Sequence, residues 1–209
     1  MIFNDRQEAA NKLYKLLKKA PLFKKEDKIV VVSILRGGLV LGSILASKLG
    51  CKNLPLAVTK VSSPYSSELA IGAICFNITY LEKENVTFFA LEKGSVRNQI
   101  KEAEYKFIQY CIKFGLSEKA FTQIKSKVIL LVDDGIATGA SVRTALLFLR
   151  SKGPAKVHLA VPVAAADTNL QGFDETYILN QPRGFRAVSQ YYRNFPQVED
   201  HEVKKLLTQ

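Results

Sequence analysis

The sequence contains few of the residues from which disulfide frameworks and metal sites are built. Its 209 residues include three cysteines and two histidines, and tryptophan is absent. Cys51, Cys75 and Cys111 are widely spaced among apolar neighbours and form no Cys-x-x-Cys pair. An odd number of scattered cysteines does not fit a disulfide scaffold, and a zinc site needs closely spaced ligands. We therefore expect reduced, partly buried cysteines.

Long hydrophobic runs are also missing. The longest, Ile29–Leu35 and Val128–Val132, are far shorter than the roughly 20 residues that a membrane-spanning helix needs. The first residues lead directly into an amphipathic pattern and lack the basic-then-apolar layout of a secretory signal. We expect a protein that does not span a membrane and that works in the cytoplasm.

Acidic residues are in the minority. The chain has 19 Asp and Glu against 30 Lys and Arg, which gives a net charge of +11. Such a charge attracts polyanions, either nucleic acid or a small, heavily phosphorylated substrate. Many lysines are scattered at helical spacing, as at Lys12, Lys15 and Lys18, where a solvated helix face explains them equally well. Nucleic acid therefore remains open as a partner but is the less favoured one.

The length and the alternation of patterns predict a single domain over residues 1–209. With 47% hydrophobic residues, the chain can bury a sizeable core, alone or as a homo-oligomer. Apolar, β-branched runs alternate with amphipathic stretches, which predicts an α/β fold with a doubly wound, mostly parallel sheet and ligands at the carboxyl ends of its strands. The expected strands are 28–35, 54–61, 128–132 and 157–163, and the expected helices are 5–19, 39–49, 95–114 and 142–152.

The middle of the chain departs from this alternation. Residues 62–67 have the small, polar, proline-containing composition of a mobile loop. Three short strand candidates follow at 70–76, 78–81 and 86–91, with a charged turn before the last. Together they predict an antiparallel excursion from the main sheet.

The C-terminal part differs in composition from the rest. It is polar and aromatic, so we expect a core over about 1–163 and a hood over about 164–209. Phe185, Tyr191 and Tyr192 can stack on a flat heterocycle or pack the hood itself, and packing is slightly favoured.

One predicted strand leads directly into two adjacent carboxylates, a small-residue loop and a helix start. Backbone N–H groups at the helix N-terminus, with the hydroxyls of Thr138 and Ser141, can hold a phosphate, and Gly139 permits its close approach. Asp133 and Asp134 can accept hydrogen bonds from sugar hydroxyls and help to hold a hydrated Mg²⁺. An acidic turn before a capped helix explains the same residues without a ligand.

This pattern resembles the signature of the type I phosphoribosyltransferases, which is a strand, two acidic residues, three variable positions, Thr-Gly and a small or hydroxyl residue. The resemblance implies Mg²⁺-dependent transfer of a 5-phosphoribosyl group from phosphoribosyl pyrophosphate to a nitrogen acceptor, with release of pyrophosphate. It implies catalytic ribose contacts for Asp133 and Asp134, which could hold a metal through water. The residues implied to bind the phosphorylated ribose are Gly135, Ile136, Ala137, Thr138, Gly139, Ala140 and Ser141.

A second strand end fits the same family. Arg36, Gly37 and Gly38 follow the first predicted strand and resemble the pyrophosphate loop, in which backbone amides and a basic residue contact the leaving group. Taken alone, the glycines also fit a tight turn. Lys60 stands where relatives place a catalytic lysine near the pyrophosphate, although an ordinary strand-end lysine explains it too. Residues 62–69 match the position of a loop that closes over the site.

More narrowly, the chain resembles a group of uncharacterised bacterial phosphoribosyltransferase-like proteins through residues 3–9, 68–73 and 185–192. Leu35 departs from that group, which has proline before Arg-Gly-Gly. Ala137 stands where hypoxanthine-guanine enzymes carry an aspartate, so the resemblance disfavours a 6-oxopurine acceptor.

Two non-enzymatic functions remain as alternatives. The first is a sensor of phosphoribosyl pyrophosphate or a nucleotide that binds RNA or DNA, which the net charge of +11 permits. The second is a phosphoribosyl-pyrophosphate-binding partner of a fused or neighbouring hydrolase. Product formation with a panel of bases would separate both from a transferase.

Overall fold

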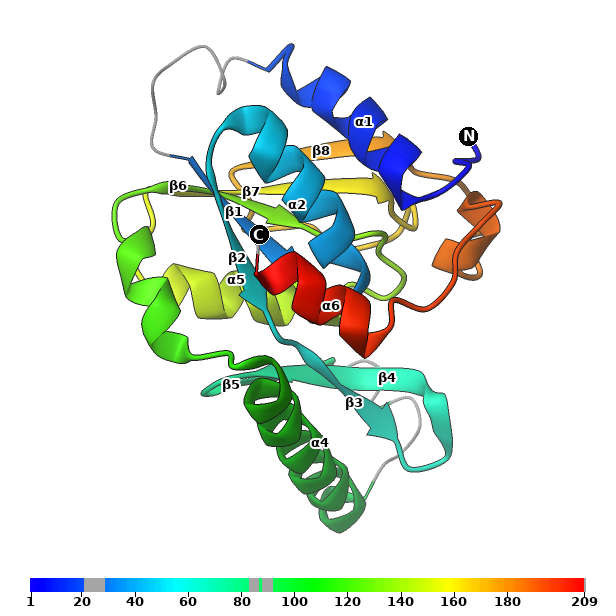
Figure 1. The fold of residues 1–209 in the computed structure, drawn as a ribbon. Helices are drawn as coiled ribbons and strands as arrows, with labels where there is room; N and C mark the ends of the chain where they lie inside the picture. Colours follow the sequence, from blue (N-terminus) through cyan, green and yellow to red (C-terminus); the bar gives the residue numbers. More distant parts are fainter. Residues whose placement is uncertain (21–28, 83–86, 88–91, 209) are drawn as a thin grey trace.

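The main sheet is parallel, and it confirms the predicted α/β class. A computed structural model describes residues 1–20, 29–82, 87 and 92–208. Its larger sheet has five parallel strands in the order β2-β1-β6-β7-β8 (Figure 1). The strands are β1 (Ile29–Ile34), β2 (Lys52–Leu56), β6 (Val128–Val132), β7 (Lys156–Val163) and β8 (Glu175–Asn180).

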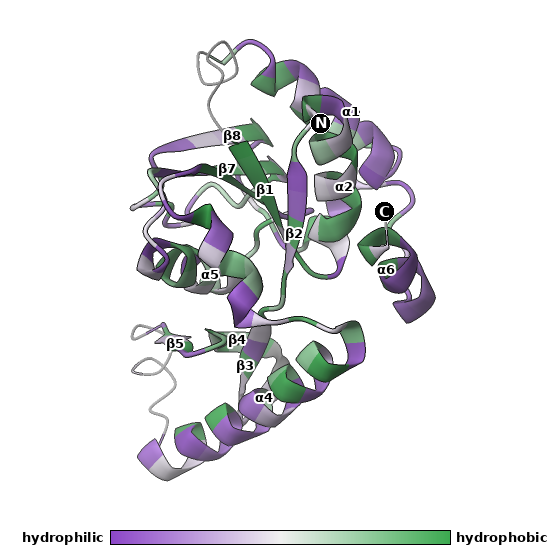
Figure 2. Cartoon of the chain, turned by 60° about the vertical axis from the view of Figure 1, so that its left-hand side comes forward, coloured by the Kyte–Doolittle hydropathy of each residue, from purple (hydrophilic) through white to green (hydrophobic). Residues whose placement is uncertain are grey.

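Helices cover both faces of this sheet. α1 (Arg6–Leu17) and α2 (Gly37–Leu49) lie on one face, and α5 (Ala140–Ser151) lies on the other. Because strand side chains alternate between faces, Val31 packs with α1 and α2 while Val30 packs with α5. Burial on both faces explains the uninterrupted apolar runs, and Figure 2 shows β1 and β7 as strongly hydrophobic.

A smaller antiparallel sheet lies beside the main one. It has the order β3-β4-β5 and is covered by α4, whose Phe107 packs with Val61 and Ile71 of the sheet. The predicted antiparallel excursion is thus confirmed as far as Leu81. The charged turn beyond Glu82 and the strand at 86–91 lie outside the described residues, apart from Thr87. The elements are β3 (Thr59–Ser63), β4 (Ser66–Cys75), β5 (Ile78–Leu81) and α4 (Lys93–Phe114).

Two predictions in this region are wrong. The strand predicted at 54–61 is divided, because the chain leaves the main sheet after Leu56 and enters the small sheet at Thr59. Ala57 at the crossing is buried in the core of the small sheet, which made the run look continuous. The loop predicted at 62–69 is mostly strand, since Ser63 already pairs with Ser66 across a two-residue turn.

The helix ends follow local rules. Asp5 caps α1 by accepting a hydrogen bond from the N–H of Glu8 at 2.8 Å, as its spacing predicts. Gly50 and Gly115 end α2 and α4 in the left-handed conformation, as predicted. α2 and α5 both begin two residues earlier than predicted, at the glycine-containing loops.

The predicted division between core and hood needs correction. β8 pairs with β7, so the main sheet continues to Asn180 rather than ending near 163. β8 is an edge strand with exposed residues, which explains why its polar composition suggested a hood. Residues beyond β8 return to the N-terminus, where Phe3 N–H donates to Tyr191 O at 2.8 Å, and then form α6 (Asp200–Leu207) beside α2. None of the described helices is long and apolar enough to cross a membrane.

Candidate functional site

The loop after β6 is held by the strand next to it. Ile136 N–H donates to Val163 O at 2.9 Å, and Ala165 N–H donates back to Ile136 O at 3.0 Å. The chain then turns through Gly139, whose φ of 90° is left-handed, and α5 begins at Ala140. The loop therefore stands at the carboxyl end of the sheet with the helix N-terminus behind it.

A cavity of about 250 Å³ brings together most of the predicted site residues. Asp133 lines it from β6, Lys60 reaches it from β3, and Val188 borders it from the C-terminal segment. Ala70 and Gly72 of β4 and Val142 of α5 also line it. The rest of the lining is formed by the predicted phosphate-binding residues Gly135, Ile136, Ala137, Thr138, Gly139, Ala140 and Ser141. Ile136 and Ala140 are 2% and 3% exposed, so they have little side chain to offer a ligand and contribute mainly backbone.

The two carboxylates of the acidic pair have different surroundings. Asp134 accepts a hydrogen bond from Arg6 Nε at 2.8 Å, and its backbone oxygen accepts one from the hydroxyl of Tyr192 at 2.7 Å. Asp133 lines the cavity instead, and its Oδ1 accepts the N–H of Asp134 at 2.8 Å. One carboxylate thus faces the cavity and the other faces the protein.

Burial and proximity shift the ionisation of this pair. Burial, followed by the charge of Asp134, raises the pKa of Asp133 well above its ordinary value. Burial also raises the pKa of Asp134, against the opposing charge of Arg6. Charge near Asp133 is therefore poorly compensated, which favours a hydroxyl donor or a cation in the cavity.

The glycines of the predicted pyrophosphate loop lie directly behind the acidic pair. A Cβ on Gly37 would stand 1.7 Å from Asp134 Oδ2, and one on Gly38 would stand 2.7 Å from Val132 O. Both distances are below any normal contact, so neither position can hold a larger residue without movement. Gly37 and Gly38 also begin α2, which makes them a helix start rather than a free turn.

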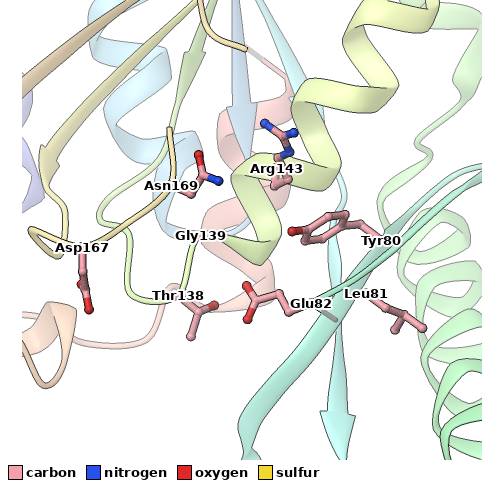
Figure 3. Close-up of a pocket in the computed structure, with 8 residues that line it drawn as sticks. All are labelled: Tyr80, Leu81, Glu82, Thr138, Gly139, Arg143, Asp167 and Asn169. Carbon is pink, nitrogen blue, oxygen red and sulfur yellow. The ribbon is translucent and has the colours of Figure 1, made fainter. Parts of the chain in front are cut away.

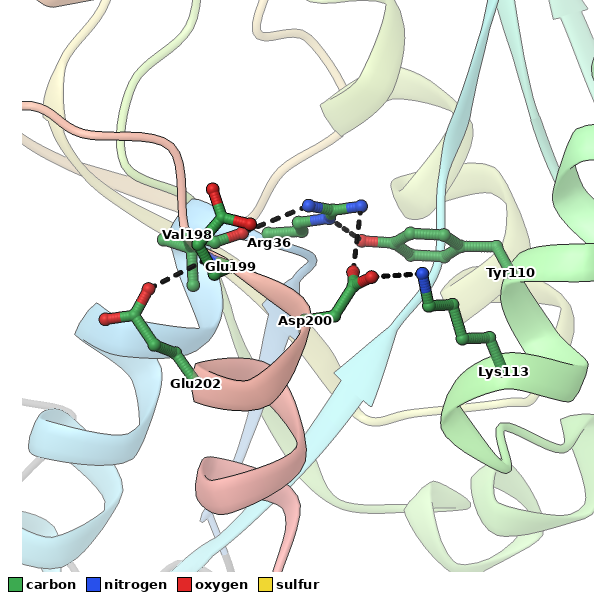
Figure 4. A network of polar contacts seen from close by, with 7 residues as sticks. All are labelled: Arg36, Tyr110, Lys113, Val198, Glu199, Asp200 and Glu202. Atoms are coloured by element: carbon green, nitrogen blue, oxygen red, sulfur yellow. Dashed lines mark hydrogen bonds and ion pairs between the residues drawn. The ribbon is translucent and has the colours of Figure 1, made fainter.

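Arg36 does not face the cavity. Its guanidinium donates to the hydroxyl of Tyr110 at 3.1 Å and to Val198 O at 3.1 Å, and pairs with Asp200 Oδ1 at 3.1 Å (Figure 4). Lys113 binds the other oxygen of Asp200, and its hydrogen bond lowers the pKa of that carboxyl. The predicted leaving-group arginine is thus engaged by α4 and α6.

A second cavity of about 350 Å³ lies on the other side of the loop. It shares Thr138 and Gly139 with the first cavity. Tyr80 and Glu82, near the end of β5, line it as well, and their side chains point toward the start of α5 (Figure 3). Arg143 lines it from α5. Basic, acidic and aromatic side chains therefore lie together beyond the phosphate loop.

The aromatic residues of the C-terminal segment mostly contact one another. Phe185 and Tyr191 stack with ring centroids 5.4 Å apart, and Tyr192 stacks on Phe195 at 4.5 Å. Tyr192 is also buried against Phe3. These contacts favour the packing role for the predicted aromatics over stacking on a ligand.

The donor set suits a magnesium ion that arrives with its substrate. Among the described residues no group of three or more acidic, histidine or cysteine side chains could hold a metal. Mg²⁺ usually keeps several waters and binds through one or two carboxylates plus substrate phosphates. Asp133 at the cavity wall fits such an ion, whereas Asp134 is engaged by Arg6.

Some residues of the site were not predicted from the sequence. Arg6 belongs to a segment that resembles a protein group, but no role follows from its place there, and the predicted packing role of Tyr192 does not include its hydrogen bond to Asp134 O. Val188 meets the loop closely, because a Cβ on Gly135 would stand 2.5 Å from Val188 Cγ1. Local signals could not reveal these contacts, which join residues up to 128 positions apart.

The parallel sheet and the cavity at its carboxyl edge define the class of doubly wound α/β proteins that bind ligands at strand ends. Within this class, residues 3–180 match the model of the phosphoribosyl transferase domain. The chain therefore belongs to the phosphoribosyl transferase family.

Individual relatives agree with this assignment. The chain is 31% identical to a Mycobacterium tuberculosis protein provisionally named a phosphoribosyl transferase, over 99% of this chain and 46% of the relative. It thus spans about half the length of these curated relatives. TT1426 from Thermus thermophilus superposes with a TM-score of 0.74 at 29% identity, over 99% and 98% of the two chains. A Staphylococcus aureus hypoxanthine phosphoribosyltransferase shares the fold, with a TM-score of 0.52 at 13% identity over 88% and 78%.

Proposed function

We propose that the protein transfers the 5-phosphoribosyl group between phosphoribosyl pyrophosphate and a nitrogen acceptor, with release of pyrophosphate. The observation that carries the proposal is the joint lining of one cavity by Asp133, Lys60 and the loop 135–141. A carboxylate, a lysine and a helix N-terminus match the hydroxyls and phosphates of this donor.

The loop 135–141 would hold the 5′-phosphate of the donor. Backbone N–H groups near Gly139 stand at the start of α5, where the helix dipole favours an anion. The hydroxyls of Thr138 and Ser141 also border the cavity. Asp133 would accept hydrogen bonds from the ribose hydroxyls, which fixes the sugar next to its phosphate.

The reaction breaks the bond from ribose C1 to the pyrophosphate oxygen and forms one from C1 to the acceptor nitrogen. Positive charge develops at C1 as the leaving group departs, and the carboxylate of Asp133 would favour that charge. Lys60 would neutralise negative charge on the pyrophosphate. Mg²⁺, bound with the donor, supplies further charge neutralisation.

The acceptor would lie in the cavity beside Val188, because Val188 is the part of the lining that the C-terminal segment supplies. A flat, nucleobase-like heterocycle suits a partly apolar wall of this kind. Ala137 supplies no carboxylate for proton transfer, so we propose an acceptor other than a 6-oxopurine.

Calorimetric titration with phosphoribosyl pyrophosphate and Mg²⁺ tests the donor site. We expect binding by the wild type, and a loss of at least about tenfold in Asp133→Asn, because a charge-assisted partner of the ribose is removed. Glu104→Gln, an exposed residue of α4, makes the same change of charge away from the cavity and should bind normally.

Pyrophosphate release with a panel of bases then tests transfer. Release with one base class and none without a base supports the proposed reaction. Failure of the wild type to bind the donor would contradict it, and binding without release by any base would indicate a sensor instead.

A further inference from the structure

Arg6 joins the acidic pair to the two ends of the chain. It is the first residue of α1, and its Nε donates to Asp134 Oδ2 at 2.8 Å. The side chains of Arg6 and Asp134 are 11% and 15% exposed, so this ion pair is largely removed from water. Such pairs are weakly screened and have a fixed geometry.

The other side of Arg6 is held by the C-terminal segment. Its guanidinium carbon lies 3.8 Å from the centre of the Phe195 ring, and its Nη1 donates to Pro196 O at 2.7 Å. Tyr192, stacked on Phe195, donates its hydroxyl to Asp134 O. Arg6 and Tyr192 therefore both tie residues 192–196 to Asp134.

The acidic pair has one fixed counter-charge. Two adjacent, partly buried carboxylates repel each other, and a cation held on one of them reduces this repulsion. Arg6 supplies that cation to Asp134 Oδ2, which also lies next to Gly37, and neither Arg6 nor Asp134 is among the residues that line the cavity. Asp133 keeps its place at the cavity wall.

We propose that Arg6 is a positioning residue of the phosphoribosyl site, which fixes the Asp134 carboxylate away from the cavity so that Asp133 alone faces the ribose. This inference rests on the proposed function and deepens it. Arg6 also connects Phe195 and Pro196 to the acidic pair.

The test compares donor binding by the wild type and Arg6→Gln. We expect the dissociation constant of phosphoribosyl pyrophosphate with Mg²⁺ to rise about tenfold or more, as for lost partners that orient a binding group. Arg6→Lys keeps the charge but lacks the planar guanidinium, and we expect partial rescue.

Arg193→Gln is the matched control. Arg193 also links the C-terminal segment to the N-terminus, through its Nη1 and Asn4 Oδ1 at 3.3 Å, without touching Asp134. We expect its donor affinity to match that of the wild type. Equal losses in both arginine variants would show a general effect on the chain ends and overturn the specific role of Arg6.

A double variant separates positioning from direct contact. If Arg6 acts through Asp134, Arg6→Gln should weaken binding much less in an Asp134→Asn background than in the wild type. An undiminished effect there would mean that Arg6 contacts the donor itself. Melting temperatures are measured without ligand for the wild type, the two single variants and the double variant. They show whether each variant is folded and whether Arg6 and Asp134 are coupled in stability.

Two failures remain distinguishable. If the wild type does not bind the donor, the proposed function fails and the role of Arg6 fails with it. If the wild type binds and the folded Arg6→Gln variant binds equally well, only the inference about Arg6 is overturned.

Discussion

Two loops at the same edge of the main sheet use glycine in different ways. β1 and β6 are paired neighbours, and each leads through glycines into a helix, α2 after β1 and α5 after β6. The β6 loop opens toward a cavity, which its residues 135–141 line. In the β1 loop, Gly37 and Gly38 pack closely against the acidic pair, and the side chain of Arg36 contacts α4 and α6.

The two loops need glycine for different physical reasons. In the β6 loop, Gly139 is needed for its left-handed φ of 90°. In the β1 loop, the glycines are needed because there is no room for a Cβ beside Asp134 and Val132. The β6 loop lines the cavity for which we propose a phosphate, whereas the glycines of the β1 loop pack against Asp134 and against the backbone of Val132 and Asp133.

The largest effect is expected from Gly37→Ala. Its Cβ would stand 1.7 Å from Asp134 Oδ2, so the carboxylate or the start of α2 must move. Overpacking of this kind costs about 1–3 kcal/mol of the free energy of unfolding, and donor binding should fall at least tenfold, by about the effect of a displaced binding group. Chemical denaturation and calorimetry measure the two quantities.

Gly94→Ala is the control for that substitution. Gly94 lies in the first turn of α4, and its Cβ would meet none of the described atoms within 4 Å. We expect unchanged binding and equal or slightly higher stability, because alanine favours a helix. If Gly37→Ala behaved like this control, close packing of the β1 loop on the acidic pair would be disproved.

The second largest effect is a difference in stability between the Asp134→Asn and Asp133→Asn variants. Asp134→Asn leaves Arg6 without its anion, which costs about 1–3 kcal/mol of the free energy of unfolding at neutral pH. Removal of a carboxyl whose pKa is raised by burial offsets part of this loss, and we expect a net decrease. Asp133 has a raised pKa, so its ionisation favours the unfolded state above the ordinary pKa of about 4. Asp133→Asn should therefore leave stability unchanged or increase it at neutral pH, with no gain at pH 3.

Denaturation curves of both variants at the two pH values measure this contrast. Donor binding should be weakened in both, since Asp133 faces the ribose and Asp134 is part of the same pair. Equal losses of stability in the two variants would contradict the assignment of one carboxylate to the cavity and the other to the protein.

A smaller effect is expected from Asp200→Asn, which weakens the hold of α6 on Arg36. If Arg36 contributes to pyrophosphate binding, freeing its guanidinium from Asp200 should lower the dissociation constant of pyrophosphate with Mg²⁺ a few-fold. A change of this size corresponds to the free energy of a partly exposed ion pair. Glu202→Gln on the same helix makes the same change of charge and keeps an oxygen for the Glu199 N–H, so it should have no effect. Weaker binding in Asp200→Asn would mean that Arg36 acts from its present position.

The smallest effect on binding is expected at the opposite end of the sheet. His158 on β7 is 1% exposed, and neither ring nitrogen has a hydrogen-bond partner among the described residues. Burial lowers the pKa of His158, so the unfolded chain binds the proton more readily and stability falls as pH drops below about 6.5. His158→Leu should reduce this acid loss in denaturation experiments while donor binding stays at the wild-type level.

The sequence was most informative where structure is local. The run from β6 through the acidic pair to α5 is contiguous, so hydrophobicity, turn residues and helix start could be interpreted together. The same holds for the cap of α1 at Asp5 and the ends of α2 and α4 at Gly50 and Gly115. Errors occurred where the chain changes sheets after Leu56 and where the edge strand β8 carries polar residues.

By itself, the sequence determined the parallel α/β class and the loop 133–141, because hydrophobic period, glycine and capping residues act over a few positions. Only the tertiary structure decided that Arg6 binds Asp134 across 128 positions, that Arg36 turns to Tyr110 and Asp200, and that Lys60 reaches the cavity from a second sheet. The physical reason is that charge pairing and close packing depend on which distant segments meet. No local pattern encodes that choice.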